Sequence, residues 1–190
     1  WAPRPWGKPG GMQTPVPPPG PPPPPPPRHE LLDGTRVPRP PQPLFHMRAI
    51  RLLEWRLLAQ APAASDVLRQ FAIALDERNH PEPDVLVTRP GVDMSAQQTH
   101  LDPQDVALAI EIVSEDTADR DREATRMYAA HGIRHFWRVE EGSEGLPVVY
   151  VHELDPATRA YVSTGIHRNR LKLAEPFAID IDLTTIDRRR

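Results

Sequence analysis

The sequence predicts a single α/β domain that follows a proline-rich segment. Two stretches, residues 44–60 and 117–131, carry apolar side chains at helical spacing, and short apolar runs typical of strands lie between and after them. The expected order is therefore helix, three strands, helix and strand, with further strands towards the C-terminus. The 190 residues include 26 prolines, and their concentration near the N-terminal end separates that segment from the material of one domain.

The N-terminal segment, residues 1–27, contains few apolar residues and ends in an unbroken run of prolines. Proline lacks a backbone N–H and fixes φ, so such a run favours an extended polyproline II conformation. We expect residues 1–27 to be a disordered, proline-rich spacer and residues 28–187 to form the domain. The alternative is a docking peptide for an aromatic groove, which would make the chain a protein-interaction module.

Deletion of residues 1–27 is expected to leave the melting temperature unchanged. The segment offers little apolar surface to offset the entropy that it would lose on ordering. Differential scanning calorimetry of the full and shortened chains measures the difference. A clear fall in the melting temperature would mean that the segment packs on the domain.

The first elements of the domain follow from a turn signal and from helical spacing. Asp33-Gly34 lies between apolar residues, and such a pair favours a two-residue turn, so we expect a hairpin over residues 30–37. Prolines between positions 38 and 43 then interrupt regular structure. The helix over residues 44–60 is predicted from apolar residues at one helical stripe, namely Met47, Ile50, Leu53 and Leu57.

The remaining elements are strands and one more helix. The run over residues 106–113 is the most apolar of the chain and is expected to be a buried strand. The second helix, residues 117–131, is expected to have Ser114 or Thr117 as its N-cap and Gly132 as its C-terminal stop. The other strands are expected over residues 67–75, 84–88, 133–139, 147–154, 159–164 and 177–183, with a polar loop over residues 89–103.

Composition and charge exclude several classes of protein. The chain has no cysteine, which excludes disulfides, thiolate zinc sites and cysteine nucleophiles and fits a reducing compartment. A formal net charge of −3 is not that of a constitutive nucleic-acid coat protein. No apolar run approaches the roughly 20 residues that span a bilayer, and no signal peptide is recognisable. We therefore expect a cytoplasmic protein without a membrane partner.

Two carboxylates stand out because they lie beside apolar strand residues. Glu111 falls inside the apolar run 106–113, and Asp84 opens the run 84–88. A carboxylate in such a place must be paired, protonated or bound to a cation, because its burial alone is very costly. Mg²⁺ prefers oxygen ligands and keeps several waters, so two carboxylates at the ends of neighbouring strands are one candidate site for it. The alternative is that each carboxylate meets an arginine.

Five short motifs then suggest a family. They are Glu-Leu-Leu-Asp-Gly at 30–34, Pro-Asp-Val-Leu-Val at 83–87, Glu-Ile-Val-Ser at 111–114, Tyr-Ala-Ala-His-Gly-Ile at 128–133 and Phe-Trp-Arg-Val at 136–139. In this order and spacing the chain resembles the Uma-two family of restriction-endonuclease-like proteins from about residue 28 to residue 183. The resemblance implies the PD-(D/E)XK nuclease fold, whose core is helix, three strands, helix and strand.

The resemblance also implies an activity and a site. Pro83-Asp84 is similar to the Pro-Asp element of the family, Glu111 to its second acid, and Glu30 to the glutamate of its early segment. The implied catalytic residues are Glu30, Asp84 and Glu111, with Asp84 and Glu111 binding Mg²⁺ or Mn²⁺. The implied substrate is DNA, whose phosphodiester bonds would be hydrolysed. Nucleases of this fold often form homodimers, but the sequence does not identify a dimer surface.

One position departs from the family pattern. The lysine that the nuclease signature places two residues after the second acid is replaced here by Val113. The family generally carries it on the following helix instead, where this sequence has Thr125. Arg122 or Arg126 could supply positive charge to a phosphoryl oxygen, although a guanidinium stays protonated and cannot act as a base. A catalytically inactive relative that acts as a binding module therefore remains the alternative.

Overall fold

The computed structural model describes residues 29–113 and 118–187, without the side chains of residues 118–121. The proline-rich segment and the candidate caps Ser114 and Thr117 lie outside the described residues. Their expected roles stay predictions.

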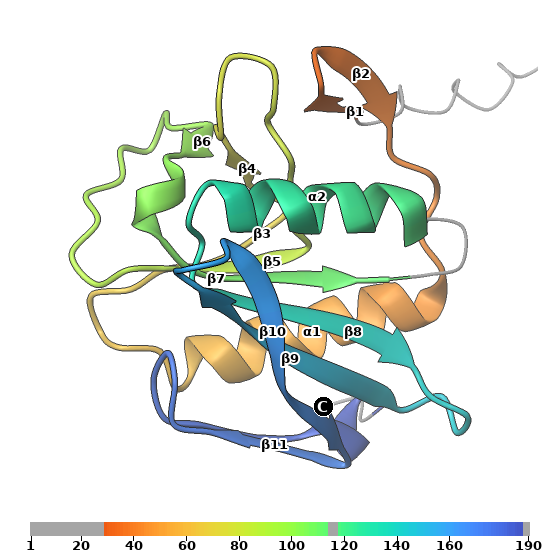
Figure 1. Ribbon diagram of the computed structural model, residues 1–190. Coiled ribbons are helices and arrows are strands. Elements are labelled where there is room, and N and C mark those ends of the chain that lie inside the picture. Colours follow the sequence, from red (N-terminus) through yellow and green to blue (C-terminus); the bar gives the residue numbers. More distant parts are fainter. Residues whose placement is uncertain (1–28, 114–117, 188–190) are drawn as a thin grey trace, which may run out of the picture.

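The centre of the fold is a six-stranded mixed sheet with the strand order β10-β9-β8-β7-β5-β3 (Figure 1). The neighbours β7 and β8 run parallel, and the other neighbouring pairs run antiparallel. In chain order the strands of this sheet are β3 (Val67–Arg69), β5 (Val85–Thr88), β7 (Val106–Ile112), β8 (His135–Glu141), β9 (Pro147–Asp155) and β10 (Ala160–Arg168).

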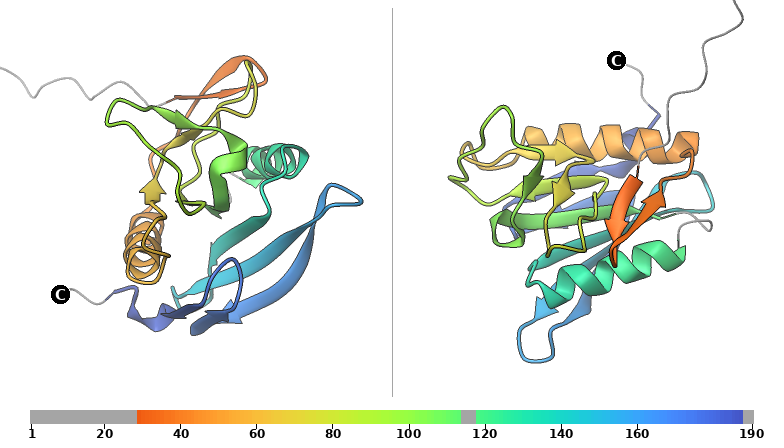
Figure 2. Two further views of the ribbon diagram at one scale, coloured as in Figure 1. Left: turned by 90° about the vertical axis from the view of Figure 1, so that its left-hand side faces the viewer. Right: turned by 90° about the horizontal axis from the view of Figure 1, so that it is seen from above.

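Two helices cover opposite faces of the sheet, as Figure 2 shows. Helix α1 (Leu44–Leu58) packs its buried residues against Val85, Ile110 and their neighbours on one face. Helix α2 (Ala118–Ala130) places Ala124 and Tyr128 against the other face, beside Leu86 and Ala109. Successive strand residues alternate between faces, so both helices have an apolar surface to bury.

This arrangement confirms the expected fold class. Helix α1 is followed by β3, β5 and β7, then by α2 and by β8, and the strands β9 and β10 extend the sheet after this core. A parallel pair such as β7 and β8 needs a crossover connection, and α2 supplies it. Glu111 is the second-last residue of β7, so the predicted site lies at the end of β7 from which the chain continues to α2.

Three small two-stranded sheets surround the core. They are β1 (His29–Leu32) with β2 (Thr35–Pro38), β4 (Ala72–Ile73) with β6 (His100–Leu101), and β11 (Arg170–Leu173) with β12 (Ile179–Asp182). The 3₁₀ turns η1 (Pro103–Asp105) and η3 (Leu183–Thr185) precede β7 and follow β12. Leu171, Ile179 and Ile181 extend the core on the α1 face.

The hairpin and its link to α1 confirm the turn prediction. Leu32 pairs with Thr35, and the two residues between them, Asp33 and Gly34, have φ values of 48° and 74°. Positive φ at both central positions is what the expected two-residue turn requires. Prolines occupy four of the six positions from 38 to 43, so the link between the hairpin and α1 has little conformational freedom.

Some expected details were wrong for local reasons. Met47 is 52% exposed, because the buried line of α1 runs through His46 and Ile50 instead. The strand expected over 67–75 is divided at Gln70, whose φ of 50° turns the chain out of the main sheet. The loop over 89–103 contains β6, which pairs with β4. Strand β11, which pairs with β12, lies outside all the expected strands.

Within the part of the chain that the structure describes, none of the helices is long and apolar enough to cross a membrane.

Candidate active site

Asp84 and Glu111 lie on adjacent strands at the same end of the sheet. In the antiparallel register of β5 and β7, Val85 pairs with Ile110, so the next step along this ladder brings Asp84 opposite Glu111. Directly opposed residues of an antiparallel pair share a face. Both side chains are almost fully buried, as the apolar sequence around them predicts.

The Asp84 carboxylate is held by three donors. Oδ1 accepts a hydrogen bond from Arg39 Nη2 at 2.9 Å and lies 3.0 Å from His46 Nε2, while Oδ2 accepts one from the backbone N–H of Ile112 at 2.9 Å. The other ring nitrogen of His46, Nδ1, lies 3.1 Å from the carbonyl oxygen of Ile112. Both ring nitrogens thus face oxygen atoms, and both contacts are hydrogen bonds when each nitrogen carries a proton.

The Glu111 carboxylate accepts a hydrogen bond from a buried phenol. Tyr128 of α2 donates its hydroxyl proton to Glu111 Oε1 at 2.8 Å. Burial, together with the negative charges of Glu111, Glu30 and Asp84, raises the pKa of Tyr128 well above its usual value. Tyr128 therefore stays protonated and remains a donor to Glu111.

Tyr128→Phe is expected to lower the free energy of unfolding by about 1.5–3 kcal/mol, the usual range for a hydrogen bond to a charged group. Urea denaturation at pH 7 measures the loss. Tyr161→Phe is the matched control, because the Tyr161 hydroxyl donates to the uncharged carbonyl of Ile133 at 2.7 Å and should be worth only about 0.5–1.5 kcal/mol. A larger loss in Tyr161→Phe would contradict the assignment of a charged acceptor at Tyr128.

Glu30 joins the same cluster through Arg39. Arg39 Nε lies 3.4 Å from Glu30 Oε1, and Arg39 Nη1 lies 3.6 Å from Glu82 Oε2. The backbone N–H of Glu82 also donates to Glu30 Oε1 at 3.4 Å. The structure therefore brings the three acids predicted from the sequence, Glu30, Asp84 and Glu111, to one place and adds Glu82 to them. We call these four acids with Arg39 the carboxylate cluster.

Burial and charge act in opposite directions on Arg39. Burial alone lowers the pKa of a guanidinium, but Asp84, Glu30, Glu111 and Glu82 outweigh it and raise the pKa of Arg39 above its usual value. Arg39 is thus a permanent cation among four acids. His46 is the other side chain of the group that can carry a positive charge.

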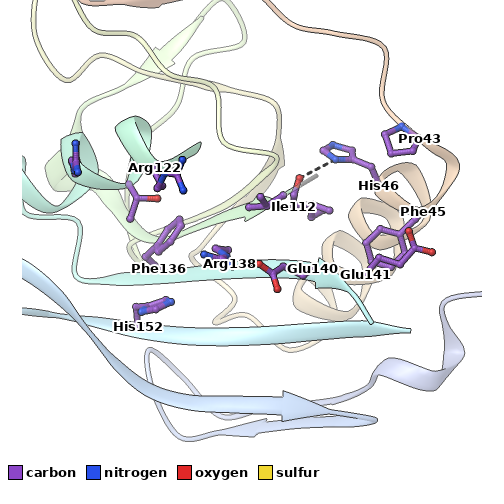
Figure 3. A pocket seen from close by; sticks show the side chains of 13 residues that line it. Pro43, Phe45, His46, Ile112, Arg122, Phe136, Arg138, Glu140, Glu141 and His152 are labelled. Atoms are coloured by element: carbon purple, nitrogen blue, oxygen red, sulfur yellow. Dashed lines mark hydrogen bonds and ion pairs between the residues drawn. The ribbon is translucent and has the colours of Figure 1, made fainter. Parts of the chain in front are cut away.

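A pocket of about 870 Å³ opens beside the cluster, between the N-terminal end of α1, the end of β7 and α2 (Figure 3). His46 and Ile112 line one part of it, and Arg122, Phe136 and Arg138 line another. Its cationic and imidazole side chains outnumber its acids. In full, the lining side chains that carry charge or can be protonated are His46, Arg122, Arg126, Arg138, Glu140, Glu141 and His152.

The position that departs from the family pattern also lies in this pocket. Thr125 lines it together with Arg122 and Arg126 of the same helix. Arg126 is largely exposed and lies 3.7 Å from Glu123. Its guanidinium is thus on a solvated face of the helix, where a phosphate could also reach it. The neighbouring residue Ala124 does not line the pocket, because its side chain packs in the core under α2.

The donor set fits a hard divalent cation when the substrate or water completes it. Carboxylate oxygens are the ligands that Mg²⁺ prefers, and Mg²⁺ is commonly held by one or two carboxylates with waters and phosphate. Three of the roughly four acceptor positions of Asp84 are taken. Among residues 29–113 and 118–187, no group of three or more His, Cys, Asp or Glu side chains is placed to hold a metal alone.

The comparison with protein families decides the relationship of the chain. The family model described as "Uma2: Putative restriction endonuclease" matches residues 20–185. The chain belongs to the Uma2 family. The resemblance inferred from the five motifs is thereby confirmed, and membership supports a nuclease-like function.

A solved structure shares the fold of this Uma2 protein. The crystal structure of "a putative nuclease belonging to DUF820 from Anabaena variabilis ATCC 29413" superposes with a TM-score of 0.60 at 12% sequence identity. The alignment covers 84% of this chain and 89% of that one. No curated protein matches the chain. At this identity the likeness establishes the fold and leaves the site to the geometry above.

The sequence did not indicate a role in the site for three residues. Arg39 lies between Pro38 and Pro40 in a link for which the sequence predicts no regular structure. His46 shares a helical stripe with Ile50, and a polar residue on a buried stripe is a usable signal. Tyr128 opens the motif at 128–133, but nothing in the sequence shows that its hydroxyl donates to Glu111.

The stability of the protein should fall as the pH drops below about 6.5, in part through His152 at the pocket wall. Burial and the nearby charge of Arg138 lower the pKa of His152 from its usual value of 6.5. The unfolded chain then takes up a proton near pH 6.5 that the folded chain does not, so stability is lost as the pH falls. Urea midpoints between pH 8 and pH 5 should fall less in His152→Gln than in the wild type. An equal fall in both would contradict the role of His152.

Proposed function

We propose that this Uma2 protein is a divalent-metal-dependent DNA endonuclease whose activity is weakened by the absence of the family lysine. The observation that carries the proposal is the convergence of Glu30, Asp84 and Glu111 near the edge of the sheet where β5 begins and β7 ends, next to a pocket with three arginines. In this proposal Asp84 and Glu111 hold Mg²⁺ or Mn²⁺, and Glu30 lies close by.

The side chains around the acids have positioning roles. The backbone N–H of Ile112 and the ring of His46 fix the Asp84 carboxylate from two sides, and Tyr128 fixes Glu111. Fixed carboxylates lose little freedom when a cation binds, which is the general advantage of a preorganised site. A bound Mg²⁺ would polarise the phosphoryl oxygen and lower the pKa of a coordinated water.

The pocket supplies the contacts for a DNA backbone. Arg122, Arg126 and Arg138 line it, and a guanidinium is the side chain best suited to a phosphate because it offers a planar fork of donors. Arg138 is also engaged by Glu140 and lies over the Tyr150 ring at 5.3 Å from its centroid. In this proposal all three arginines of the pocket contact backbone phosphates.

Thr125 favours a second candidate function. A hydroxyl at the lysine position can form hydrogen bonds but carries no charge, so transition-state charge would be stabilised less than in an intact site. The same fold and pocket could then bind DNA without cutting it. Such a non-catalytic relative would keep the DNA affinity that the arginines provide.

A plasmid-nicking assay tests the proposal. Supercoiled DNA is incubated with the protein for several hours with Mg²⁺ or Mn²⁺ or with EDTA, and fluorescence anisotropy with a labelled duplex measures binding in parallel. Slow nicking that requires the metal and disappears in Glu111→Gln is the expected result. Nicking that survives EDTA or Glu111→Gln would contradict the proposed site. Binding without any nicking would favour the second candidate.

A further inference from the structure

The carboxylate cluster already contains a cation that belongs to the protein. The Arg39 side chain is only 5% exposed, and its three nitrogens each face a different acid: Nε faces Glu30 at 3.4 Å, Nη2 faces Asp84 at 2.9 Å and Nη1 faces Glu82 at 3.6 Å. Each nitrogen thus faces a separate carboxylate, so none of the three acids is bound by the two-nitrogen fork that a guanidinium can offer. One of these three nitrogens forms no hydrogen bond with the described residues, however.

Arg39 Nη1 is the imperfect part of this arrangement. It is buried and, within the described residues, donates no hydrogen bond, and 3.6 Å from Glu82 is beyond good hydrogen-bond geometry. A buried donor without a partner destabilises the state that contains it. Arg39 therefore offsets only part of the negative charge of the four acids and leaves Nη1 without a hydrogen bond in the described part of the chain, so its hold on the cluster is weaker than its burial suggests.

The backbone around Arg39 brings the side chain to the acids in advance. Arg39 lies between Pro38 and Pro40, and a residue that precedes proline is restricted to extended conformations. The hairpin on one side is anchored by the pairing of Leu31 with His80, and α1 begins at Leu44 on the other. The side chain has several rotatable bonds of its own, so it can leave the cluster while this backbone stays in place.

We propose that Arg39 is a resident counter-ion of the carboxylate cluster, which a divalent cation must displace from Asp84 before it can bind. The inference rests on the proposed function only in taking the cluster as a cation site, since it concerns metal binding and not cleavage. A divalent cation and the Arg39 guanidinium at the same Asp84 carboxylate would repel each other. A divalent cation must then outcompete the guanidinium, and Arg39 lowers the apparent affinity for metal.

Calorimetric titration of metal-free protein with Mn²⁺ tests the inference. Arg39→Gln and Arg39→Met, which keep most of the side-chain length without the charge, should bind Mn²⁺ at least tenfold more tightly than the wild type. Arg170→Gln is the matched control, because it removes the same charge from an exposed ion pair with Asp180 on β11 and β12, and its affinity should equal that of the wild type. Equal affinity in all four proteins, or weaker binding in the Arg39 variants, would overturn the proposal.

A second measurement covers variants that fail to fold. Arginine Nε–Hε resonances of the wild type can be followed by NMR during titration with diamagnetic Mg²⁺, and the Arg39 signal should shift and exchange faster with solvent as the side chain leaves Asp84. An Arg39 signal that does not change at saturating Mg²⁺ would overturn the proposal. Tight metal binding by Arg39→Gln without DNA cleavage would support the counter-ion role and count against the nuclease function. An absence of metal binding in every protein would remove both.

Discussion

Thr125→Lys should increase metal-dependent cleavage of supercoiled plasmid by about 10²–10⁴-fold, the usual contribution of a positioned proton-transfer group. Thr125 lines the same pocket as His46 and Ile112, which both contact Asp84, so we expect the ammonium of a lysine there to extend towards the carboxylate cluster. That ammonium would orient the attacking water and stabilise charge on the phosphoryl group. Initial nicking rates of the two proteins in the same Mn²⁺ and salt give the ratio.

Two controls separate charge at the pocket from other effects of the substitution. Thr125→Met adds comparable length without charge and should stay at the wild-type rate, and Glu111→Gln in the Thr125→Lys background should remove the gained activity. A lysine at the preceding position could not take this role, because the side chain of Ala124 packs in the core. No gain from Thr125→Lys in a folded protein would mean that position 125 does not replace the lysine of the family.

Asp84→Ala should lower the free energy of unfolding by about 3–5 kcal/mol, because it leaves Arg39 as a buried charge without its nearest partner. Asp84 is the acid to which Arg39 hydrogen-bonds, and it also accepts from the Ile112 N–H. Its substitution therefore affects folding as well as any bound cation. Urea denaturation in EDTA isolates the effect on folding.

A double substitution distinguishes the ion pair from ordinary packing. Asp84→Ala with Arg39→Met removes both charges, so its loss should be smaller than the sum of the two single losses. Asp180→Ala breaks the exposed pair with Arg170 and should leave the free energy of unfolding near the wild-type value. Strict additivity of the two substitutions in the cluster would show that Arg39 and Asp84 do not stabilise each other.

The architecture was predictable because it depends on local periodicity. The apolar stripe of α1, the apolar run of β7 and the Asp33-Gly34 turn each carry their signal within a few neighbouring residues. The break at Gln70 was not predictable in this way, since its positive φ depends on where the chain must go to pair β4 with β6. Non-local pairing of two-residue strands leaves almost no pattern in the sequence.

The site was predictable only in its acids. Glu30, Asp84 and Glu111 were named from the resemblance and from the cost of burying a carboxylate in an apolar strand, and their catalytic and metal-binding roles remain predictions. Burial of Asp84 did imply a partner, but the sequence contains too many arginines to identify Arg39 as that partner. The contact depends on the path of a proline-rich link across the end of the sheet, which periodicity does not describe.

The distances along the chain between members of the cluster limit when a complete site can exist during synthesis. Asp84 is separated along the chain by 45 residues from Arg39, by 38 from His46 and by 28 from Ile112. Tyr128 and Glu111 are 17 residues apart. Such non-local contacts form late, after the loops between them have closed. A chain still on the ribosome therefore cannot present the acids together with their Tyr128 contact until α2 has emerged and docked. The complete arrangement of side chains is a property of the folded chain and not of its early segments.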